Sequence, residues 1–235
     1  AGHSHLLAAE LEGAPVLAPS ILDLAGATRS EETFTCHLTQ ELPFMLPPDL
    51  AGRLVRPQFG LGGGAGGLLE AARAFAAAFD VPVRRAARAL WRGLRVQGRF
   101  AEARQCAGRD ALGAQTDRAV VVIGRPYNLH DPFANLELAR HLEKVGLSAI
   151  PVDMLPLDEE VLDDRWSSLP WQFARQALRA VECMRRDPRL FPLVVSSFGC
   201  GVDGFVFKHL EELLADRPHL LLEFDEHRAE AGLVT

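Results

Sequence analysis

The chain has 235 residues, 48% of them hydrophobic, which is enough to bury a packed core in one large α/β domain or in two lobes. A formal net charge of −6 gives no general basic field, so neither nucleic acid nor an anionic membrane surface is a favoured partner. The sequence has no apolar run of about eighteen residues and no charged-then-apolar leader, so we expect a soluble, cytoplasmic protein.

Residues 1–60 are predicted to form an N-terminal α/β lobe. A short proline-bounded strand is expected at 15–20 and another at 54–59, with Cys36 between them. Cys36 and His37 could each ligate a metal, but adjacent side chains rarely face one ion together. The sequence starts at Ala1 and stops at Thr235, and we expect it to be a piece of a longer protein.

Residues 61–117 are predicted to be a glycine-rich connector followed by helices. A glycine cluster at 60–67 precedes a helical pattern, as in a phosphate-binding loop, but no Lys-Ser or Lys-Thr follows it. A flexible connector is therefore the favoured interpretation, and no ATP-binding signature is visible. One helix is expected from 68 to a break at Val81-Pro82, and a second from Val83 toward Cys106.

Residues 118–235 predict a Rossmann-like lobe with an open parallel sheet. Apolar runs at 119–123, 148–152, 191–195 and 219–224 read as buried strands, and helical patterns separate them. One continuous helix is expected from Pro132 to Val145, and others begin at Pro170 and Phe205. The order β-α-β-α-β-α-β, closed by right-handed crossovers, gives a sheet with helices on both faces.

Ligands of such sheets bind beyond the carboxyl ends of the strands, so the residues that follow each apolar run are the candidate site. These residues are Arg125, Tyr127, Asn128, Asp153, Cys200, Asp225, Glu226 and His227.

Cys200 stands out because it lies between two glycines, after a strand and before a helix. Asp203 is expected to cap that helix, and the free helix N–H groups would favour the thiolate, the form that binds metals. A small buried cysteine at a strand end is the alternative. A Cys-dependent acyl transferase with His227 as base is a further, weaker alternative. The other cysteines, Cys106 and Cys183, have no comparable setting.

Several loops at this predicted edge agree together with one known family. They are Gly124-Arg125-Pro126-Tyr127-Asn128, Asp131-Pro132 with Asn135, Ile150-Pro151-Val152-Asp153-Met154-Leu155-Pro156-Leu157, Ser197-Phe198-Gly199-Cys200-Gly201, and Asp225-Glu226-His227 with Ala231-Gly232. In these loops the chain resembles the activase-related region of the large 2-hydroxyacyl-CoA dehydratase activator proteins. The resemblance covers most of residues 119–235 and, more loosely, residues 15–59.

The resemblance implies a role beside ATPase domains that carry a 4Fe-4S cluster and drive electrons into a CoA-ester dehydratase. By position it makes Cys36 and Cys200 candidate ligands of an iron–sulfur cluster. Two cysteines do not complete a four-thiolate site, so a second copy in a homodimer, another domain or non-thiolate groups would have to complete it. Two functions therefore stay open: a redox-associated domain that helps to hold a cluster and transfer electrons, and a non-catalytic docking or scaffold domain without one.

Overall fold

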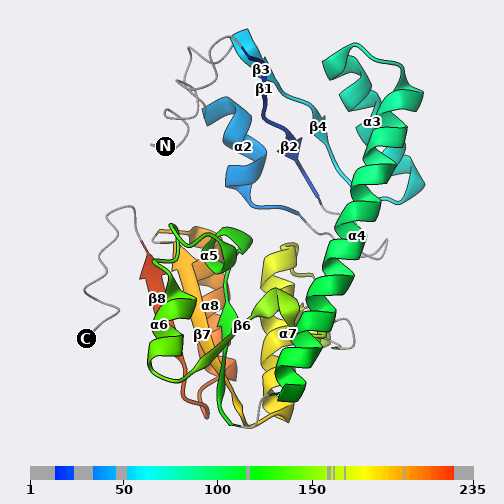
Figure 1. Cartoon of the computed structure of the whole chain (residues 1–235). Coiled ribbons are helices and arrows are strands. Elements are labelled where there is room, and N and C mark those ends of the chain that lie inside the picture. Colours follow the sequence, from blue (N-terminus) through cyan, green and yellow to red (C-terminus); the bar gives the residue numbers. More distant parts are fainter. Residues whose placement is uncertain are drawn as a thin grey trace. The chain divides into compact units, whose positions relative to one another are not determined.

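The structure, a computed structural model, describes residues 14–23, 34–45, 52–114, 117–157, 160, 162–166, 168–197 and 199–224. The chain divides into two compact units (Figure 1). The first comprises residues 1–98 and 168–172, and the second comprises residues 99–167 and 173–235.

Short parallel strands form the centre of the first unit. β1 (Val16–Leu17) pairs with β3 (Leu54–Val55), and β2 (Ser20–Ile21) pairs with β4 (Gln58–Phe59). Helix α2 (His37–Met45) lies between the two pairing segments in the chain, so this part of the unit is a β-α-β arrangement. The Ala18 and Ser20 N–H groups donate to the carbonyl oxygens of Val55 and Pro57, so pairing continues past Pro19, while Pro57 has no N–H to return a ladder bond.

Two helices complete the first unit, and the expected break between them is confirmed. α3 (Ala65–Phe79) ends at Asp80, whose φ of 49° is left-handed, and α4 (Val83–Ala114) begins just after Pro82. α4 runs past Cys106 to Ala114, and its residues from Arg99 onward belong to the second unit.

The glycines before α3 pack closely against neighbouring backbone and against Asp23. The Gly62 N–H donates to the Asp23 carboxylate. A Cβ added at Gly67 would lie 1.8 Å from the Gly62 carbonyl oxygen, so only glycine permits this approach. Close backbone packing at the start of α3 therefore explains the glycines.

The second unit contains the predicted open parallel sheet, with the strand order β6-β5-β7-β8. Its strands are β5 (Ala119–Ile123), β6 (Ser148–Pro151), β7 (Leu190–Ser197) and β8 (Leu220–Phe224), and every pairing is parallel. All five residues of β5 are buried, as the unbroken apolar run predicted. The Rossmann-like α/β prediction is confirmed.

Helices cover both faces of this sheet. α5 (Pro126–His130) and α6 (Leu138–Lys144) connect β5 to β6; η2 (Val152–Met154), η4 (Asp164–Trp166) and α7 (Gln172–Arg186) follow β6; and α8 (Gly201–Leu213) connects β7 to β8. The first crossover runs in the opposite direction from the other two, so right-handed connections place α6 on one face and α7 and α8 on the other (Figure 1).

The prediction of one continuous helix from Pro132 to Val145 is wrong. Leu136 and Glu137 have φ values of 54° and 55°, and a helix cannot pass through left-handed residues. The buried Asn135 side chain donates to the carbonyl oxygens of Asn128 and Leu129, which holds residues 131–137 as turns against α5. A helix forms again only at Leu138.

Within the described ranges, no helix is both long and apolar enough to span a membrane.

Candidate functional site

The topology of the second unit places a crevice site at the carboxyl ends of β5 and β7. The chain leaves β5 toward β6 on one side and then returns past β5 to β7 on the other. In open α/β sheets, ligands bind where the direction of the connections reverses in this way. The loops that follow β5 and β7 carry Arg125 and Cys200, two of the predicted site residues.

A buried ion pair joins these two loops. The Arg125 side chain donates to Asp203 Oδ1 through Nε at 3.0 Å and Nη2 at 2.6 Å. The Ser196 hydroxyl donates to the other carboxylate oxygen, Oδ2, at 2.9 Å. All three residues are buried, Asp203 completely. The Arg125 guanidinium also lies 5.2 Å from the centre of the Phe173 ring.

This pairing corrects the role expected for Asp203. Asp203 lies in the first turn of α8, but its carboxylate accepts from Arg125 and Ser196, and Cys200 is the N-cap residue. A buried carboxylate keeps its charge only when it is paired, and Arg125 supplies the pairing. Asp203 therefore ties the end of β5 to α8.

Cys200 lies where this network meets the surface. Its Sγ is 3.5 Å from Arg125 Nη2, and its backbone N–H donates to the Ser197 carbonyl oxygen at 3.1 Å. The preceding Gly199 has a φ of 76°, which favours glycine, and a Cβ added at Gly201 would meet nothing within 4 Å. The thiol is half-buried beside a cation, at an open stretch of backbone.

Tyr127 lies at the same edge of the sheet. Desolvation raises the pKa of its hydroxyl above the ordinary value, and a hydrogen bond with the Ser197 side chain and the positive charge of Arg125 act in the opposite direction. The negative charge of Asp203 reinforces the rise. Tyr127 therefore senses the same charged network as Cys200, while part of its ring stays exposed to solvent.

A second polar cluster surrounds Asp153 at the end of β6. Its Oδ2 accepts from Arg104 Nη1 at 2.7 Å and lies 2.8 Å from His130 Nε2. Its other oxygen, Oδ1, is buried with no hydrogen-bond partner in the described part of the chain, and the same holds for Asn128 Nδ2. These two polar side chains lie near the end of the sheet, but no contact joins them to Cys200 in the described residues.

The structure thus brings together only part of the predicted site. Arg125 and Cys200 are in contact, and Tyr127 interacts with the same charges. Asp153 belongs to the separate Arg104–His130 cluster, and Cys36 belongs to the first unit.

Asp225, Glu226 and His227 lie outside the described residues, so their predicted roles remain predictions.

Ser196 and the pairing role of Asp203 were not predicted from the sequence. A signal for Asp203 was available, because it lies on the same side of α8 as the buried Val206, Phe207 and Leu210. A charged residue on a buried helix face requires a partner of opposite charge. Arg125, at the end of a strand buried on both faces, was the natural candidate.

The described residues do not by themselves form an iron–sulfur site. Such clusters take four cysteine thiolates, and among the residues that the structure describes no three His, Cys, Asp or Glu side chains gather as a metal-binding group. Cys200 has a guanidinium, not a second thiol, as its nearest polar partner of those the structure describes.

The fold and this edge define the second unit as a Rossmann-like α/β domain with a candidate site at its switch point. The chain belongs to the family of the CoA enzyme activase uncharacterised domain (DUF2229), whose family model matches residues 1–155. The predicted activase relationship is thereby confirmed, and the function of the chain belongs with that of CoA enzyme activase systems in general. No curated protein and no solved structure matches the chain.

Proposed function

We propose that the chain is an accessory domain of a CoA enzyme activase system and that it docks a partner protein through the edge formed by Tyr127, Cys200 and Gly201. The observation that carries this proposal is the buried Arg125–Asp203 pair. This pair holds the Cys200 loop against the end of β5. The backbone at Gly201 stays open, because a Cβ added there would meet nothing within 4 Å. Partners from the same system are the ATPase component and the CoA-ester dehydratase.

The chemistry of the edge suits docking better than catalysis by this chain alone. The charge of Arg125 is already matched by Asp203, so it is not available to activate a substrate. Among the described residues, the polar side chain that contacts the Cys200 thiol is Arg125, and His227, the base expected for a Cys-dependent acyl transfer, lies outside them. Of the described residues, those that offer groups to a partner here are Tyr127 with its hydroxyl, Cys200 with its thiol and Gly201 with its open backbone.

A bulky side chain at Gly201 tests the docking edge. Gly201→Arg places a long side chain in open space at the start of α8, whereas Gly113→Arg does the same in the last turn of α4, away from the edge. With the ATPase component of the same system as the partner, calorimetry should show affinity at least about tenfold weaker for Gly201→Arg and unchanged for Gly113→Arg. Equal affinities for the two variants would overturn the proposal.

A second candidate function is favoured by the position of Arg125 Nη2, 3.5 Å from the Cys200 sulfur at the N-terminus of α8. A neighbouring cation and helix N–H groups are the setting in which cysteines ligate metals. We propose that Cys200 supplies one ligand of an iron–sulfur cluster that a partner or a second copy completes. In that role the domain would help electrons to reach a CoA-ester dehydratase or reductase.

Iron and sulfide counts on anaerobically prepared protein separate the two functions. If Cys200 is a ligand, the complex with the ATPase component should contain more iron than that component alone. Cys200→Ser should abolish the excess and Cys36→Ser should reduce it, while Cys106→Ser and Cys183→Ser leave it unchanged. A complex without excess iron would leave docking as the function.

A further inference from the structure

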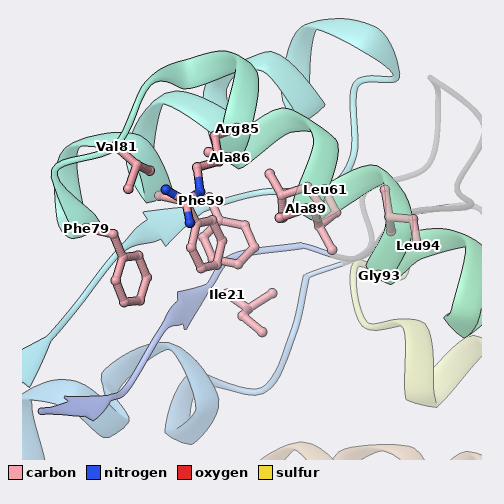
Figure 2. A pocket seen from close by; sticks show the side chains of 12 residues that line it. Ile21, Phe59, Leu61, Phe79, Val81, Arg85, Ala86, Ala89, Gly93 and Leu94 are labelled. Atoms are coloured by element: carbon pink, nitrogen blue, oxygen red, sulfur yellow. The ribbon is translucent and has the colours of Figure 1, made fainter.

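The first unit contains an apolar pocket that the proposed function does not use. It has a volume of about 570 Å³ and lies among β2, β4, α3 and the first part of α4 (Figure 2). Side chains such as Phe59, Phe79 and Leu94 line it, and Figure 2 shows them around one hollow. All of its lining residues belong to the first unit.

Three phenylalanine rings form one wall of the pocket. The centres of the Phe59 and Phe75 rings are 4.9 Å apart at a tilt of 50°, and those of Phe75 and Phe79 are 6.2 Å apart and stacked. Ring pairs at these distances attract one another, which stabilises the arrangement of the wall. Phe79 is still 46% exposed, so the wall leaves apolar surface in contact with water.

The pocket is open on the side of α4 because the helix has small residues where it lines the pocket. Ala86, Ala89 and Gly93 line the pocket, and a Cβ added at Gly93 would meet nothing within 4 Å. A larger residue at Gly93 would therefore occupy the space rather than clash with the backbone. The pocket is within the volume range of small-molecule sites, about 300–1,000 Å³.

One charged residue, Arg85, completes the lining. It lies in the first turn of α4, and its side chain is exposed and forms no ion pair or hydrogen bond with the rest of the described chain. An apolar hollow with a single cation at its edge complements a ligand with an apolar chain and one negative group. A neutral or cationic ligand would leave the guanidinium unmatched.

We propose that this pocket binds an amphiphilic carboxylate, with its aliphatic chain against the phenylalanine wall and its carboxylate on Arg85. The concave shape and the single charge favour a small molecule over a protein segment. Binding of such a ligand would bury apolar surface on both sides and give a negative heat-capacity change.

Dodecanoate, below its micelle-forming concentration, is a suitable probe for calorimetry on the 235-residue chain. We expect saturable binding at one site with a negative heat-capacity change, and binding of the chain-matched cation dodecyltrimethylammonium at least about tenfold weaker. Equal binding of the two amphiphiles, or no binding of dodecanoate, would overturn the proposal. Self-association of the chain that dodecanoate does not reverse would assign the pocket to a second copy and would also overturn it.

Two pairs of variants locate the site. Gly93→Leu fills the hollow, and Gly98→Leu is its control on the same helix, since an added Cβ there also meets nothing within 4 Å. Both changes raise helix propensity, so both variants should fold. We expect at least about tenfold weaker dodecanoate binding for Gly93→Leu and none of that loss for Gly98→Leu.

The second pair tests the charge. Arg85→Gln should weaken dodecanoate binding by about two- to fivefold, the range of an exposed ion pair, while Arg84→Gln, next to it and outside the lining, should not. The Arg85→Gln change should leave the weaker binding of the cation unchanged or improved. If Gly93→Leu and Arg85→Gln both bind as the wild type does, the ligand lies elsewhere and the proposal fails.

Discussion

Arg125 and Asp203 face each other with almost no access to water, so each depends on the other for its charge. Replacing one leaves a buried, unmatched charge, whereas replacing both removes the need for a match. We expect Arg125→Met to lower the free energy of unfolding of the second unit by about 3–5 kcal/mol. Urea denaturation followed by circular dichroism measures this loss.

The control for that loss is the exposed pair of Arg140 and Glu137, where Arg140→Met should have little effect because solvent screens both charges. The double variant Arg125→Met with Asp203→Leu should be more stable than Arg125→Met alone. A double variant as unstable as the sum of its single variants would show that the two side chains act independently.

Tyr127 is the one tyrosine of the sequence, so tyrosine absorbance reports on this residue alone. Because desolvation raises its pKa, its ionisation midpoint in the folded protein should lie above the ordinary value of 10.0. The hydrogen bond with Ser197 lowers the pKa, so Ser197→Ala should move the midpoint higher still. A midpoint at or below the ordinary value would place the hydroxyl in water.

The same shift has a consequence for stability. A raised pKa in the folded state means that, near the ordinary pKa, the folded protein holds the proton more tightly than the unfolded chain does. The stabilisation from neutral Tyr127 is present below the ordinary pKa and is lost as the pH rises through the folded-state value. Tyr127→Phe should therefore lose less stability than the wild type between about pH 9 and pH 11.

At the scale of elements, the end of α3 offers a test of backbone strain. Asp80 occupies a left-handed conformation at the C-cap, the position where glycine is favoured. Asp80→Gly should raise the free energy of unfolding by up to about 1 kcal/mol. Glu70→Gly, also exposed but inside the same helix, should lower it by about 1 kcal/mol. Thermal unfolding of the two variants should shift in opposite directions, and a shared direction would contradict the strain at Asp80.

The elements that could be predicted are those encoded by local pattern. The unbroken apolar run of β5 and the Val81-Pro82 break between α3 and α4 needed only neighbouring residues. The left-handed pair Leu136–Glu137 could not be predicted, because its apolar spacing fits a helix and the overriding contacts come from Asn135 to the α5 carbonyl groups. Tertiary hydrogen bonds outweighed helix propensity there.

The candidate site divides in the same way. The order of apolar runs placed Arg125 and Cys200 at one edge of the sheet, since parallel strands all end on the same side. The separation of Asp153 from Cys200 depends on Arg104 and His130, which side-chain packing brings to Asp153 from α4 and α5. Such packing leaves no periodic trace in the sequence.

At the scale of the whole molecule, the first unit is discontinuous in sequence. Residues 168–172 join it through a bridge between Phe34 and Trp171, and the Phe34 N–H donates to the Pro170 carbonyl oxygen at 2.9 Å. A single bridge between distant residues involves one residue on each side, so it produces no alternating sequence pattern from which it could be predicted. The family match, over residues 1–155, likewise spans the boundary between the two units, so the family's sequence pattern does not follow one compact unit.

Native-state alkylation, with each cysteine quantified by mass spectrometry, compares the accessibility and ionisation of the thiols along the chain in one experiment. Cys106 is exposed and should react fast, whereas burial, reinforced by the Glu160 carboxylate, raises the pKa of Cys183 and should make it slow near pH 8. Raising the pH should narrow the difference, because the thiolate fraction of Cys183 then increases.

In the same experiment, the alkylation rate of Cys200 shows whether the edge around it is accessible or packed. A thiol beside Arg125 Nη2, on a glycine-flanked loop, should react faster than Cys183, and the bound ATPase component should slow it without slowing Cys106. Alkylation in denaturant, where all four thiols become equivalent, supplies the control. If Cys200 reacts as slowly as Cys183 in the native chain, its thiol is packed and not accessible to a partner. If the bound ATPase component does not slow the alkylation of Cys200, the edge around Cys200 is not where that partner binds.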